Sequence, residues 1–448
     1  MSLYTDLISR AIFPLHERVK GHRSVKWRQE LESSQWLKRE AIEAIQLINL
    51  RRFLVEAGEC VPYYRNLFQT LSFSPAELTS TADLSTLPLL DKTLIRENTE
   101  SLRSEKATTL KRFNTGGSTG QPLIFYLGQD RISHDVAAKW RATRWWDVDI
   151  GDSEVVIWGS PIELGTQDHL RVWRDRLFRS ELIPAADLTE SRLAEIVEEI
   201  CQRKPKMVFG YPSVISMLAD HAMNKGCALN TLGVKVVFVT SECLYEHQRQ
   251  LIESAFGCQV ANGYGSRDAG FLAHQCPQGS LHLSAEDIVV EIVDEHGKCL
   301  PEGQAGEIVV THTATGEFPF IRYRTGDMGC ISNEPCPCGR GLPVLKDVLG
   351  RANDFLVSSD GKKFHGSSFT YVMRDIDGLE SFKIIQESRQ LVNVKLMTDR
   401  RYQADSENRI SRAFKQRLGD GVQVSFDYCQ SIPPEKSGKY RYVVSHAD

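Results

Sequence analysis

The strongest constraint on the fold is an alternation of short apolar runs with helix-like stretches between residues 151 and 310. The apolar runs have strand length and are rich in β-branched residues, whereas the stretches between them repeat apolar residues at helical spacing. Such alternation predicts a largely parallel sheet covered by helices, which is an α/β class of fold. The segments are 154–158, 192–202, 207–209, 234–240 and 245–255, and a further short strand is expected at 258–261.

Polar and aromatic side chains follow two of these runs at the point where each ends. Ser241 and Glu242 come directly after one buried run, and Tyr264 and Gly265 follow the next short one. In open parallel sheets, ligands bind in the crevice beyond the carboxyl ends of the strands. We therefore expect these four residues to line a ligand site.

A loop of glycines and hydroxyl side chains precedes this region. Residues 113–122 read Phe-Asn-Thr-Gly-Gly-Ser-Thr-Gly-Gln-Pro, which concentrates backbone N–H and neutral O–H donors in a short span. The loop is not a Walker motif, because Gln121 stands where that motif requires a lysine. A phosphate-binding loop and a plain glycine-rich turn both remain open. In the first interpretation the phosphate contacts come from Thr115, Gly117, Ser118, Thr119 and Gly120.

The pattern changes twice along the chain, which predicts more than one domain. From residue 287 it becomes antiparallel, and we expect a small β-subdomain over about 287–347. After residue 350 a small α+β domain is expected, with a charged helix at 405–418 among strands. Near the start, 27–57 repeats apolar residues at helical spacing and predicts one long amphipathic helix. The predicted division is a large multi-sheet N-terminal domain, 1–350, and a C-terminal domain, 351–448.

Charge and hydropathy argue against a nucleic-acid partner and against a membrane-spanning segment. The 448 residues include 54 basic and 58 acidic side chains, so the net charge of −4 provides no overall field for holding a nucleic acid. No uninterrupted apolar stretch reaches the length of a membrane span. The first 20 residues are too charged for a secretory signal, so we expect a cytoplasmic protein.

Four of the possible metal ligands gather around a strand-rich segment. Most of the eleven cysteines are scattered singly and are expected to be reduced core thiols. Cys276, His282, Cys336 and Cys338 form a set of soft ligands suited to a structural Zn²⁺. The Cys-x-Cys spacing is tighter than usual in zinc sites, so a turn with two free thiols is the alternative.

Several motifs follow one another in a fixed order that resembles one superfamily. The order is similar to that of the acyl-adenylate-forming (AMP-binding) enzymes, and within them to the phenylacetate-CoA ligase-like branch, which includes capsule-biosynthesis adenylate-forming homologues. The resemblance covers about residues 55–442. The motifs that carry it are 264–268, 322–327, 350–351 and 437–439, with further matches at 61–68, 87–92 and 210–213.

The resemblance implies roles for individual residues. The loop 115–120 would bind the β- and γ-phosphates of ATP, and Tyr264 would pack on adenine beside Ser241 and Glu242. Asp327 would accept the ribose hydroxyls, and Arg351 would reach the ribose or the α-phosphate. The catalytic residue would be Lys439, which bridges the carboxylate and the α-phosphate from a C-terminal lid that rotates between two half-reactions. The structural alternatives are a core tyrosine at 264 and a turn aspartate at 327.

Two adjacent residues depart from the family pattern. Asp268 stands where the family normally has a glutamate that holds Mg²⁺, and a shorter carboxylate can still ligate this hard cation. Arg267 replaces a small hydroxyl residue. It can pair with Asp268, bind phosphate or silence the metal site, so a degenerate enzyme is one alternative.

The expected function is ATP- and Mg²⁺-dependent activation of a small-molecule carboxylic acid as an acyl adenylate, with transfer to coenzyme A. Transfer to an amine, hydroxyl or carrier thiol in polysaccharide or secondary metabolism is an alternative, as is a weakly active nucleotide-binding accessory protein. Oligomeric state stays open, a homodimer included. The aromatic residues expected at the acyl pocket, or else in the core, are Trp158, Phe209 and Tyr211.

Overall fold

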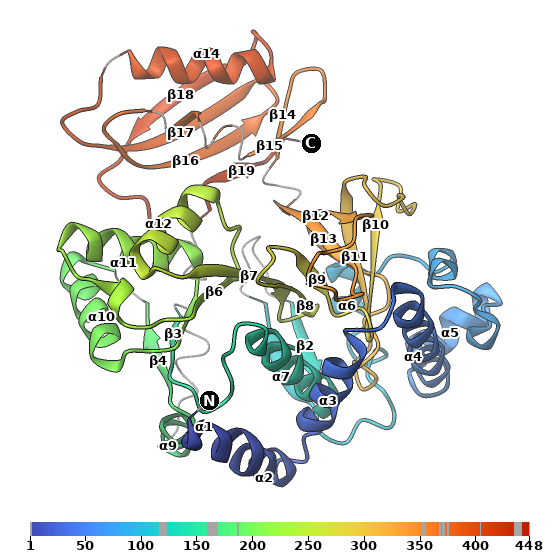
Figure 1. The fold of residues 1–448 in the computed structure, drawn as a ribbon. Helices are drawn as coiled ribbons and strands as arrows, with labels where there is room; N and C mark the ends of the chain where they lie inside the picture. The colour runs from blue at the N-terminus through green and yellow to red at the C-terminus, as the bar shows by residue number, and fades with distance from the viewer. Residues whose placement is uncertain are drawn as a thin grey trace. The chain divides into compact units, whose positions relative to one another are not determined.

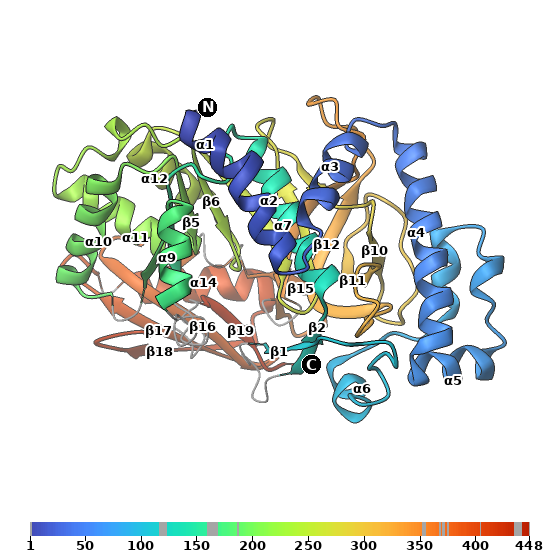
Figure 2. The same ribbon diagram turned by 90° about the horizontal axis from the view of Figure 1, so that it is seen from below.

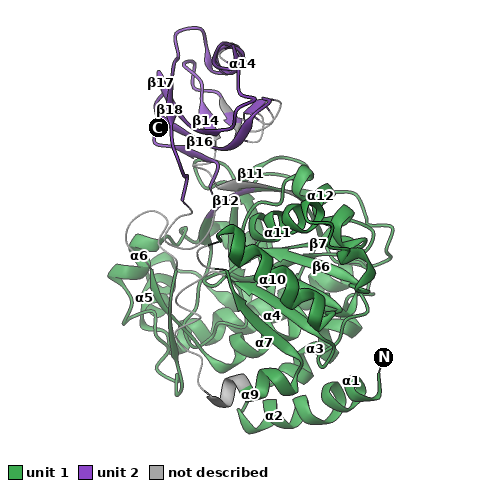
Figure 3. Cartoon of the chain, turned by 90° about the vertical axis from the view of Figure 1, so that its left-hand side faces the viewer, with its two compact units in different colours: residues 1–325, 329–348 green, residues 326–328, 349–448 purple. Residues whose placement is uncertain are grey.

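The computed structural model describes residues 2–115, 123–158, 169–185, 188–351, 355–366, 369, 372–373, 376–403, 405–433 and 441–447. The chain divides into two compact units, coloured separately in Figure 3. Unit 1 contains Met1–Thr325 and Gly329–Val348, and unit 2 contains Gly326–Met328 and Leu349–Asp448. Among the described residues, no helix combines the length and apolar character needed to cross a membrane.

Unit 1 is built on one mixed sheet of eleven strands, in the order β10-β11-β12-β13-β9-β8-β7-β6-β5-β3-β4 (Figure 1). The strands β3 to β7 pair in parallel, and the remaining pairings with given registers are antiparallel. The strands are β3 (Glu154–Trp158), β4 (Ser180–Pro184), β5 (Met207–Gly210), β6 (Val236–Thr240), β7 (Gln259–Ser266), β8 (Gly270–Gln275), β9 (Leu281–Leu283), β10 (Ile288–Val293), β11 (Gly306–His312), β12 (Tyr323–Ser332) and β13 (Val344–Arg351).

Helices cover both faces of the parallel strands. The side chains of β3, β5 and β6 alternate between two apolar clusters, one shared with α10, α11 and α12, the other with α7. The predicted α/β class is therefore confirmed. The longer helices of unit 1 are α2 (Phe13–Val19), α3 (Ser24–Ser34), α4 (Arg39–Cys60), α5 (Pro62–Leu71), α7 (Gln129–Arg144), α9 (His169–Leu177), α10 (Glu190–Arg203), α11 (Pro212–Asn224) and α12 (Glu246–Phe256).

Shorter elements complete unit 1. The strands predicted for the β-subdomain, β10 to β13, are hydrogen-bonded into the main sheet and do not form a sheet of their own. A separate antiparallel pair carries the glycine-rich loop at its tip. The short elements are α1 (Leu3–Leu7), η1 (Ile8–Ile12), η2 (Pro75–Glu77), η3 (Thr81–Thr86), α6 (Lys92–Glu97), η4 (Leu229–Thr231), and the paired strands β1 (Lys111–Asn114) and β2 (Ile124–Leu127).

The predicted long helix at 27–57 is wrong in one respect, because it breaks between α3 and α4. The Gln35 carbonyl accepts a hydrogen bond from the Gly341 N–H at 3.0 Å, outside the helical pattern. The Gln35 side chain accepts from the Trp145 indole at 2.8 Å, and the Arg340 guanidinium lies 4.7 Å from the centroid of the Trp36 ring. Contacts distant in sequence thus override a helical periodicity that is locally continuous.

Unit 2 has an apolar core between one sheet and one helix. The sheet order is β18-β17-β16-β19, and α14 (Ser406–Leu418) packs Ile410, Phe414 and Leu418 into the core. The helix falls within the range that the sequence predicts, 405–418. The strands are β14 (Phe355–Val357), β15 (Lys363–His365), β16 (Leu379–Ser388), β17 (Leu391–Thr398), β18 (Gln423–Tyr428) and β19 (Val443–Ser445).

Candidate active site

Two turns of the candidate site leave neighbouring parallel strands. β6 and β7 pair with Thr240 beside Gly263, so the segments that follow begin at the same edge of the sheet. Ser241 has a left-handed backbone with φ of 72°. Glu242 accepts a hydrogen bond from the Ser213 N–H at 3.2 Å. This bond ties the turn after β6 to the first turn of α11, where N–H groups lack partners within the helix.

Tyr264 lies inside a strand, whereas the sequence places it after one. β7 continues to Ser266 because β8 pairs with its second half, where Tyr264 stands opposite Ala273. The Tyr264 side chain is half-buried and packs against the large apolar cluster of unit 1. An aromatic side chain at the carboxyl end of β7 is thus held by the core and also reaches the surface.

Gly265 is required by a close approach of two strands. The pairing shifts register between Tyr264 and Gly265, and a Cβ atom at Gly265 would lie 2.2 Å from the carbonyl oxygen of Gly270. Real Cβ atoms do not come so near a backbone oxygen, so no side chain fits. Packing alone therefore demands glycine here, whatever contact a nucleotide makes.

The Asp268 carboxylate is buried in the turn that joins β7 to β8. One of its oxygens accepts from the Ser266 hydroxyl and the other from the Tyr323 hydroxyl. Burial alone would raise the pKa of this carboxyl. The two hydrogen bonds, helped by the positive charge of Lys92, outweigh burial and hold the pKa below its ordinary value. Asp268 is therefore charged at neutral pH.

A buried arginine supports the same turn from behind. Arg131 on α7 is 1% exposed and donates to the backbone carbonyls of Asp268 at 3.5 Å and Arg267 at 3.4 Å. Its Nε donates to both Asp135 oxygens at 3.1 Å. Sequence analysis missed Arg131 and the role of Tyr323. The only local signal for Arg131 is the acid four residues further along its helix.

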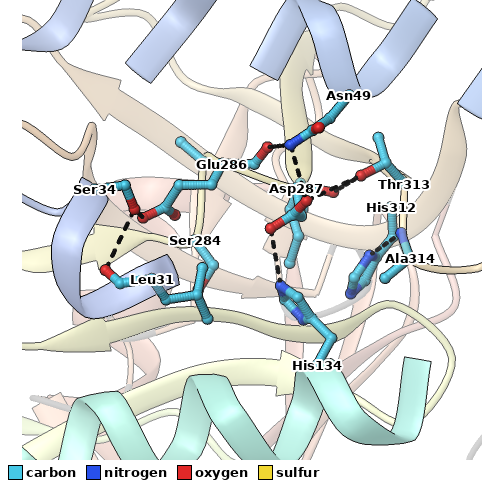
Figure 4. A network of polar contacts seen from close by, with 12 residues as sticks. Leu31, Ser34, Asn49, His134, Ser284, Glu286, Asp287, His312, Thr313 and Ala314 are labelled. Atoms are coloured by element: carbon cyan, nitrogen blue, oxygen red, sulfur yellow. Dashed lines mark hydrogen bonds and ion pairs between the residues drawn. The ribbon is translucent and has the colours of Figure 1, made fainter. Parts of the chain in front are cut away.

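Further polar groups fill the space between α7 and the antiparallel strands (Figure 4). His134 Nε2 lies 3.6 Å from Asp287 Oδ2, and Asp287 Oδ1 accepts from the Asn49 amide at 3.1 Å. The His134 and His312 rings are 4.7 Å apart, and His312 Nδ1 accepts from the Ala314 N–H at 3.3 Å. These side chains belong to helices and strands far apart in sequence, so they join α7 to the sheet.

His134, Asp135 and His312 bring possible ligand atoms within 4.8 Å of one another. Hydrogen bonding nevertheless argues against a metal. Because His312 Nδ1 accepts a hydrogen bond, the Nε2 of the neutral ring carries the proton and cannot ligate. Asp135 is already paired with Arg131, whose positive charge opposes a nearby cation. The three groups are better described as a buried polar network.

The base of the glycine-rich loop is closed by two hydrogen bonds. The Thr115 N–H donates to the Leu123 carbonyl, and the Leu123 N–H donates to the Thr115 hydroxyl oxygen, each at 3.0 Å. These bonds extend the β1–β2 pairing by one step and place the loop at its tip. The other residues predicted to bind phosphate lie outside the described part of the chain, namely Gly117, Ser118, Thr119 and Gly120.

Three predicted residues come from the later part of the chain. Asp327 is half-buried on β12 and follows Gly326, whose φ of 75° is left-handed. Arg351 ends β13, and its side chain is outside the described atoms. Lys439 is outside the described residues as well. Their proposed roles therefore stay predictions.

The three aromatic residues predicted for the acyl pocket form one group. The Trp158 ring centroid lies 4.4 Å from that of Tyr211 and 6.1 Å from that of Phe209. Phe209 is 6% exposed and Tyr211 is 1% exposed, which favours the core alternative for both. Trp158 is half-buried, and its indole N–H is buried without a hydrogen-bond partner among the described residues. Of the three aromatic residues, Trp158 is therefore the best candidate for a contact with the ligand.

The predicted Cys/His set comes together at one end of β9. Cys276, His282, Cys336 and Cys338 place their ligand atoms within 4.8 Å of one another. The Cys276 and Cys336 sulfurs are 3.7 Å apart, and Cys338 Sγ is 3.2 Å from His282 Nε2. His282 Nδ1 donates to the Leu342 carbonyl at 3.2 Å, so its Nε2 carries a lone pair toward the sulfurs. This tautomer is the one that a structural zinc ion requires.

Burial tunes the protonation of this set. It lowers the pKa of His282 to about 4, so the imidazole is neutral at pH 7, as in metal ligation. It raises the pKa of the Cys276 thiol to about 12. Burial also acts to raise the pKa of Cys336, but hydrogen bonds from Ser280, Cys338 and Cys276 lower it on balance. Zinc binding would therefore release protons.

Comparison with family models identifies two matching regions. A model described as AMP-binding enzyme matches residues 89–316, and one described as CapK C-terminal domain matches residues 356–446. The first region contains β1 to β11, including the β7–β8 turn. The second lies within unit 2.

Individual relatives match over most of the chain. Protein CapK of Staphylococcus aureus is 25% identical over 398 residues, 86% of this chain and 85% of its own length. Phenylacetate-coenzyme A ligase of Thermus thermophilus is 26% identical and covers 73% of this chain and 74% of its own. A crystal structure of 2-hydroxyisobutyryl-CoA ligase, in the postadenylation state with R3-HIB-AMP, has a TM-score of 0.74 at 20% identity, over 92% of this chain and 91% of that one.

Proposed function

Because the chain belongs to the AMP-binding enzyme family, we propose that it activates a carboxylic acid with ATP and transfers the acyl group to coenzyme A. The geometry that carries this proposal is the β7–β8 turn. There Asp268 is held in its charged form, beside the strand of Tyr264 and at the sheet edge where ligands bind. The coenzyme A ligases among the relatives support the acceptor.

The proposed reaction overcomes a poor leaving group in two steps. A carboxylate resists acyl transfer because its leaving group would be oxide. Its oxygen therefore attacks the α-phosphorus of ATP, the bond from that phosphorus to pyrophosphate breaks, and an acyl adenylate forms. The thiol of coenzyme A then attacks the acyl carbon, AMP leaves, and the thiol proton passes to solvent. Both steps gather negative charge, so positioned donors and cations dominate catalysis.

Positions in the family motifs supply the proposed roles. The loop 115–120 binds the β- and γ-phosphates, and Tyr264 packs on adenine next to Ser241 and Glu242. Asp327 accepts the ribose hydroxyls and Arg351 reaches the ribose or α-phosphate. In the transition state of adenylation, Lys439 contacts both the carboxylate and the α-phosphate. Trp158 is the proposed contact for the acyl group.

Asp268 fits the Mg²⁺ that the family uses. Its carboxylate is charged, and each oxygen keeps a lone pair beyond the one hydroxyl that it accepts. A bound Mg²⁺ supplies charge neutralisation for the phosphates. Within the chain, Ser266 and Tyr323 fix the direction of the carboxylate, and Arg131 fixes the backbone of the turn.

A magnesium titration tests this assignment. Asp268→Asn removes the charge and should raise the Mg²⁺ concentration needed for half-maximal pyrophosphate release by at least about tenfold. Asp268→Glu should keep or raise activity, because it restores the ordinary family residue. Tyr323→Phe is the matched variant that keeps the carboxylate but frees one oxygen. Identical Mg²⁺ titrations in all four proteins would remove Asp268 from the metal site.

A structural zinc ion at Cys276, His282, Cys336 and Cys338 is a separate proposal. The mutual proximity of the four ligand atoms and the His282 tautomer support it. When bound, the ion would cross-link the β8–β9 turn to the segment before β13. Protein purified without added metal should contain about one zinc per chain by elemental analysis.

Matched cysteine variants separate zinc binding from ordinary thiol chemistry. Cys336→Ser combined with Cys338→Ser should lose the zinc, whereas Cys227→Ser, at an exposed cysteine remote in sequence, should keep it. Zinc near zero in the parent protein, or zinc that persists in the double variant, would mean that these cysteines are turn thiols.

A second candidate keeps adenylation but changes the acceptor. The match to Protein CapK covers more of this chain than the match to phenylacetate-coenzyme A ligase, and the CapK C-terminal domain model matches 356–446. Residues 356–446, the region that the family uses as a lid, are thus similar to the C-terminal domain of CapK. The name of that protein does not specify a coenzyme A ligase. Transfer to an amine, hydroxyl or carrier thiol is therefore the alternative.

Pyrophosphate release distinguishes these candidates. Purified protein is incubated with ATP, Mg²⁺ and a panel of carboxylates, with and without coenzyme A. Carboxylate-dependent pyrophosphate release with a thioester product supports the first proposal. Release that continues without any effect of coenzyme A supports another acceptor. Nucleotide binding without pyrophosphate release for any acid would overturn both and favour an accessory protein, in which Arg267 has silenced the metal site.

A further inference from the structure

An exposed apolar stripe runs along the first helix of the chain. Helices α1 and α2 are joined through η1 into one continuous helix from Leu3 to Val19. The exposed apolar residues of the stripe recur at every fourth position. They are Leu3 at 91%, Leu7 at 54%, Leu15 at 62% and Val19 at 80% exposure, with exposed Ala11 at the centre.

The π-helical segment keeps this stripe straight. In a regular α-helix, residues four apart rotate by about 40° per step, so five such residues would wind around the helix. η1 (Ile8–Ile12) is π-helical, and its wider turn takes up more residues, which reduces that drift. The apolar side chains therefore stay on one side from end to end.

The opposite face of this helix is firmly seated on unit 1. Thr5 donates to Asp152 at 2.8 Å, and the Tyr4 hydroxyl donates to the Leu177 carbonyl at 2.8 Å. The Phe13 ring packs edge-on against Trp140, with centroids 5.0 Å apart. The stripe is therefore the outward side of an ordered helix and not a frayed end.

Basic and aromatic side chains border the stripe. Arg10 and Arg18 are exposed on the same helix, and Lys20 is exposed directly after it. Among the described residues of the helix, Asp6 is the one acid that is exposed or half-buried. Helix α9 runs beside α1 and α2, as both Figure 1 and Figure 2 show. It presents Trp173 at 72% exposure. Tryptophan beside apolar and basic residues is typical of proteins that enter the headgroup region of a membrane.

A cationic cavity adjoins the beginning of the helix. It has a volume of about 520 Å³, and Ser2 contributes to its lining. Arg179, another lining residue, places its guanidinium 4.0 Å from the centroid of the Tyr4 ring. The helix and the cavity are therefore continuous. The cations that line it are Arg176, Arg179, Arg203, Lys204 and Lys206.

The acids of the cavity do not neutralise all of these cations. Asp152 pairs with Lys206 at 2.8 Å, Glu181 with Arg203 at 3.2 Å, and Glu154 with Lys139 at 2.9 Å. Each lining acid thus has its own cation. Within the described part of the chain, no ion pair is formed by Arg176, Arg179 or Lys204.

We propose that the helix 3–19, the exposed face of α9 and this cavity form a docking surface for an anionic lipid membrane. The apolar stripe lies in the headgroup boundary, and the unpaired cations face negatively charged headgroups. A second copy of the chain is a poorer occupant. A two-fold contact along the stripe would place its basic border, Arg10, Arg18 and Lys20, from both copies in one interface, where like charges repel. This proposal is independent of the reaction proposed above.

Vesicle binding by the full chain tests the proposal. The protein is sedimented with vesicles of phosphatidylcholine, with and without phosphatidylglycerol as the anionic lipid. We expect binding to the anionic vesicles only, and weaker binding at high salt. Leu7→Ser combined with Leu15→Ser should weaken it at least about tenfold, as should Arg18→Gln combined with Lys20→Gln.

Control variants keep the test independent of folding. Ile48→Ser changes an exposed apolar residue, 62% exposed, on α4 and should bind as the parent does. Tryptophan fluorescence should give the same urea midpoint for every variant. Lys204→Gln combined with Arg176→Gln should reduce the preference for anionic lipid, because both residues line the cavity.

Three outcomes would overturn the proposal. The first is that the parent protein stays in solution with both kinds of vesicle. The second is unchanged binding after the substitutions in the stripe. The third is a dimer in solution that dissociates when Leu7 and Leu15 are replaced, which would make a second copy the occupant.

Discussion

Unit 1 buries many charged groups, whereas unit 2 buries none among its described residues. The polar side chains in the core of unit 2 are neutral, namely Ser358, Gln386, Ser406 and Ser445. In unit 1 the buried ionisable groups include Arg131, Arg141, Arg322, Asp268, Asp287, Glu291 and five histidines. Buried charges are costly unless they are paired, so the larger unit depends on matched partners and the smaller one on apolar packing.

The largest effect is expected for Lys439→Ala, which should lower activity without lowering the stability of unit 2. If Lys439 contacts the adenylation transition state, Lys439→Ala should lower pyrophosphate formation on the order of 10³-fold or more, with ATP binding and unfolding nearly unchanged. Arg400→Ala removes an exposed cation elsewhere in unit 2 and is the matched control. Equal adenylation rates for the parent and Lys439→Ala would exclude this lysine from the mechanism.

The next effect tests the dependence of unit 1 on paired charge. Arg322 is 2% exposed, lies 3.0 Å from Glu291, and donates to the Leu87 carbonyl at 2.6 Å. Arg322→Met leaves Glu291 buried without a cation and should lower the free energy of unfolding by about 3–5 kcal/mol. All seven tryptophans belong to unit 1, so urea titration followed by tryptophan fluorescence reports this unit.

Two further variants sharpen that measurement. Arg39→Met removes the arginine of an exposed pair with Glu43 and should cost no more than about 1 kcal/mol. Glu291→Met added to Arg322→Met should restore part of the stability, because no unpaired charge then remains. If Arg322→Met and Arg39→Met had equal effects, the contrast between buried and exposed charge would be wrong.

A third prediction concerns pH. Burial lowers the pKa of His274 to about 3 and that of His312 well below its ordinary value. Folded unit 1 keeps both rings neutral, while the unfolded chain takes up protons below about pH 6.5. The free energy of unfolding should therefore fall as pH drops below 6.5, by about 1.4 kcal/mol per pH unit for each histidine.

Urea titrations at about pH 6 and pH 5 measure this slope. His274→Phe should remove the contribution of one histidine from the slope. Phenylalanine suits this position because the His274 ring stacks on Phe271 and accepts no hydrogen bond from the described residues. His296→Asn, at an exposed histidine, is the control and should leave the slope unchanged. A slope that is the same in all three proteins would show that buried histidines do not set the acid limit.

An effect smaller than that of Arg322→Met is expected in unit 2. Gln386 is fully buried and joins β14 to β19 through hydrogen bonds with the Val357 N–H at 2.8 Å, the Val357 carbonyl at 2.7 Å and the Ser445 hydroxyl at 2.9 Å. Gln386→Leu should cost about 2 kcal/mol, independent of pH, because neutral partners are left unsatisfied. Circular dichroism should detect this loss while tryptophan fluorescence does not change. A pH-dependent loss would contradict a neutral core.

The sequence predicted correctly those helices and strands that depend on the local spacing of apolar residues. The parallel strands, the helix of unit 2 and the exit of β6 follow from runs of apolar residues and their spacing. The break near Gln35 and the extension of β7 to Ser266 do not, because partners far away in sequence impose them. The Gly341 N–H binds the Gln35 carbonyl where the predicted helix breaks, and pairing with β8 extends β7.

The same distinction applies to the candidate site. Motif order identified Asp268, and the clustering of soft ligand residues in the sequence identified the Cys/His set, which the structure gathers within ligand distance. The hydroxyl of Tyr323 and the guanidinium of Arg131 hold the Asp268 turn from 55 and 137 residues away. No spacing rule relates such residues, so only the fold reveals them.

The close approach of Gly265 to the backbone of β8 limits how the sequences of relatives can diverge at this position. A side chain at this position is excluded by the sheet itself, so glycine would persist even in a homologue that had stopped using nucleotides. Retention of Gly265 in a lineage would thus say little about whether its members are still enzymes. Asp268 is more informative, because no comparable close packing requires a carboxylate there. If Asp268 holds Mg²⁺ as proposed, replacement by a residue without a carboxylate would accompany loss of the reaction.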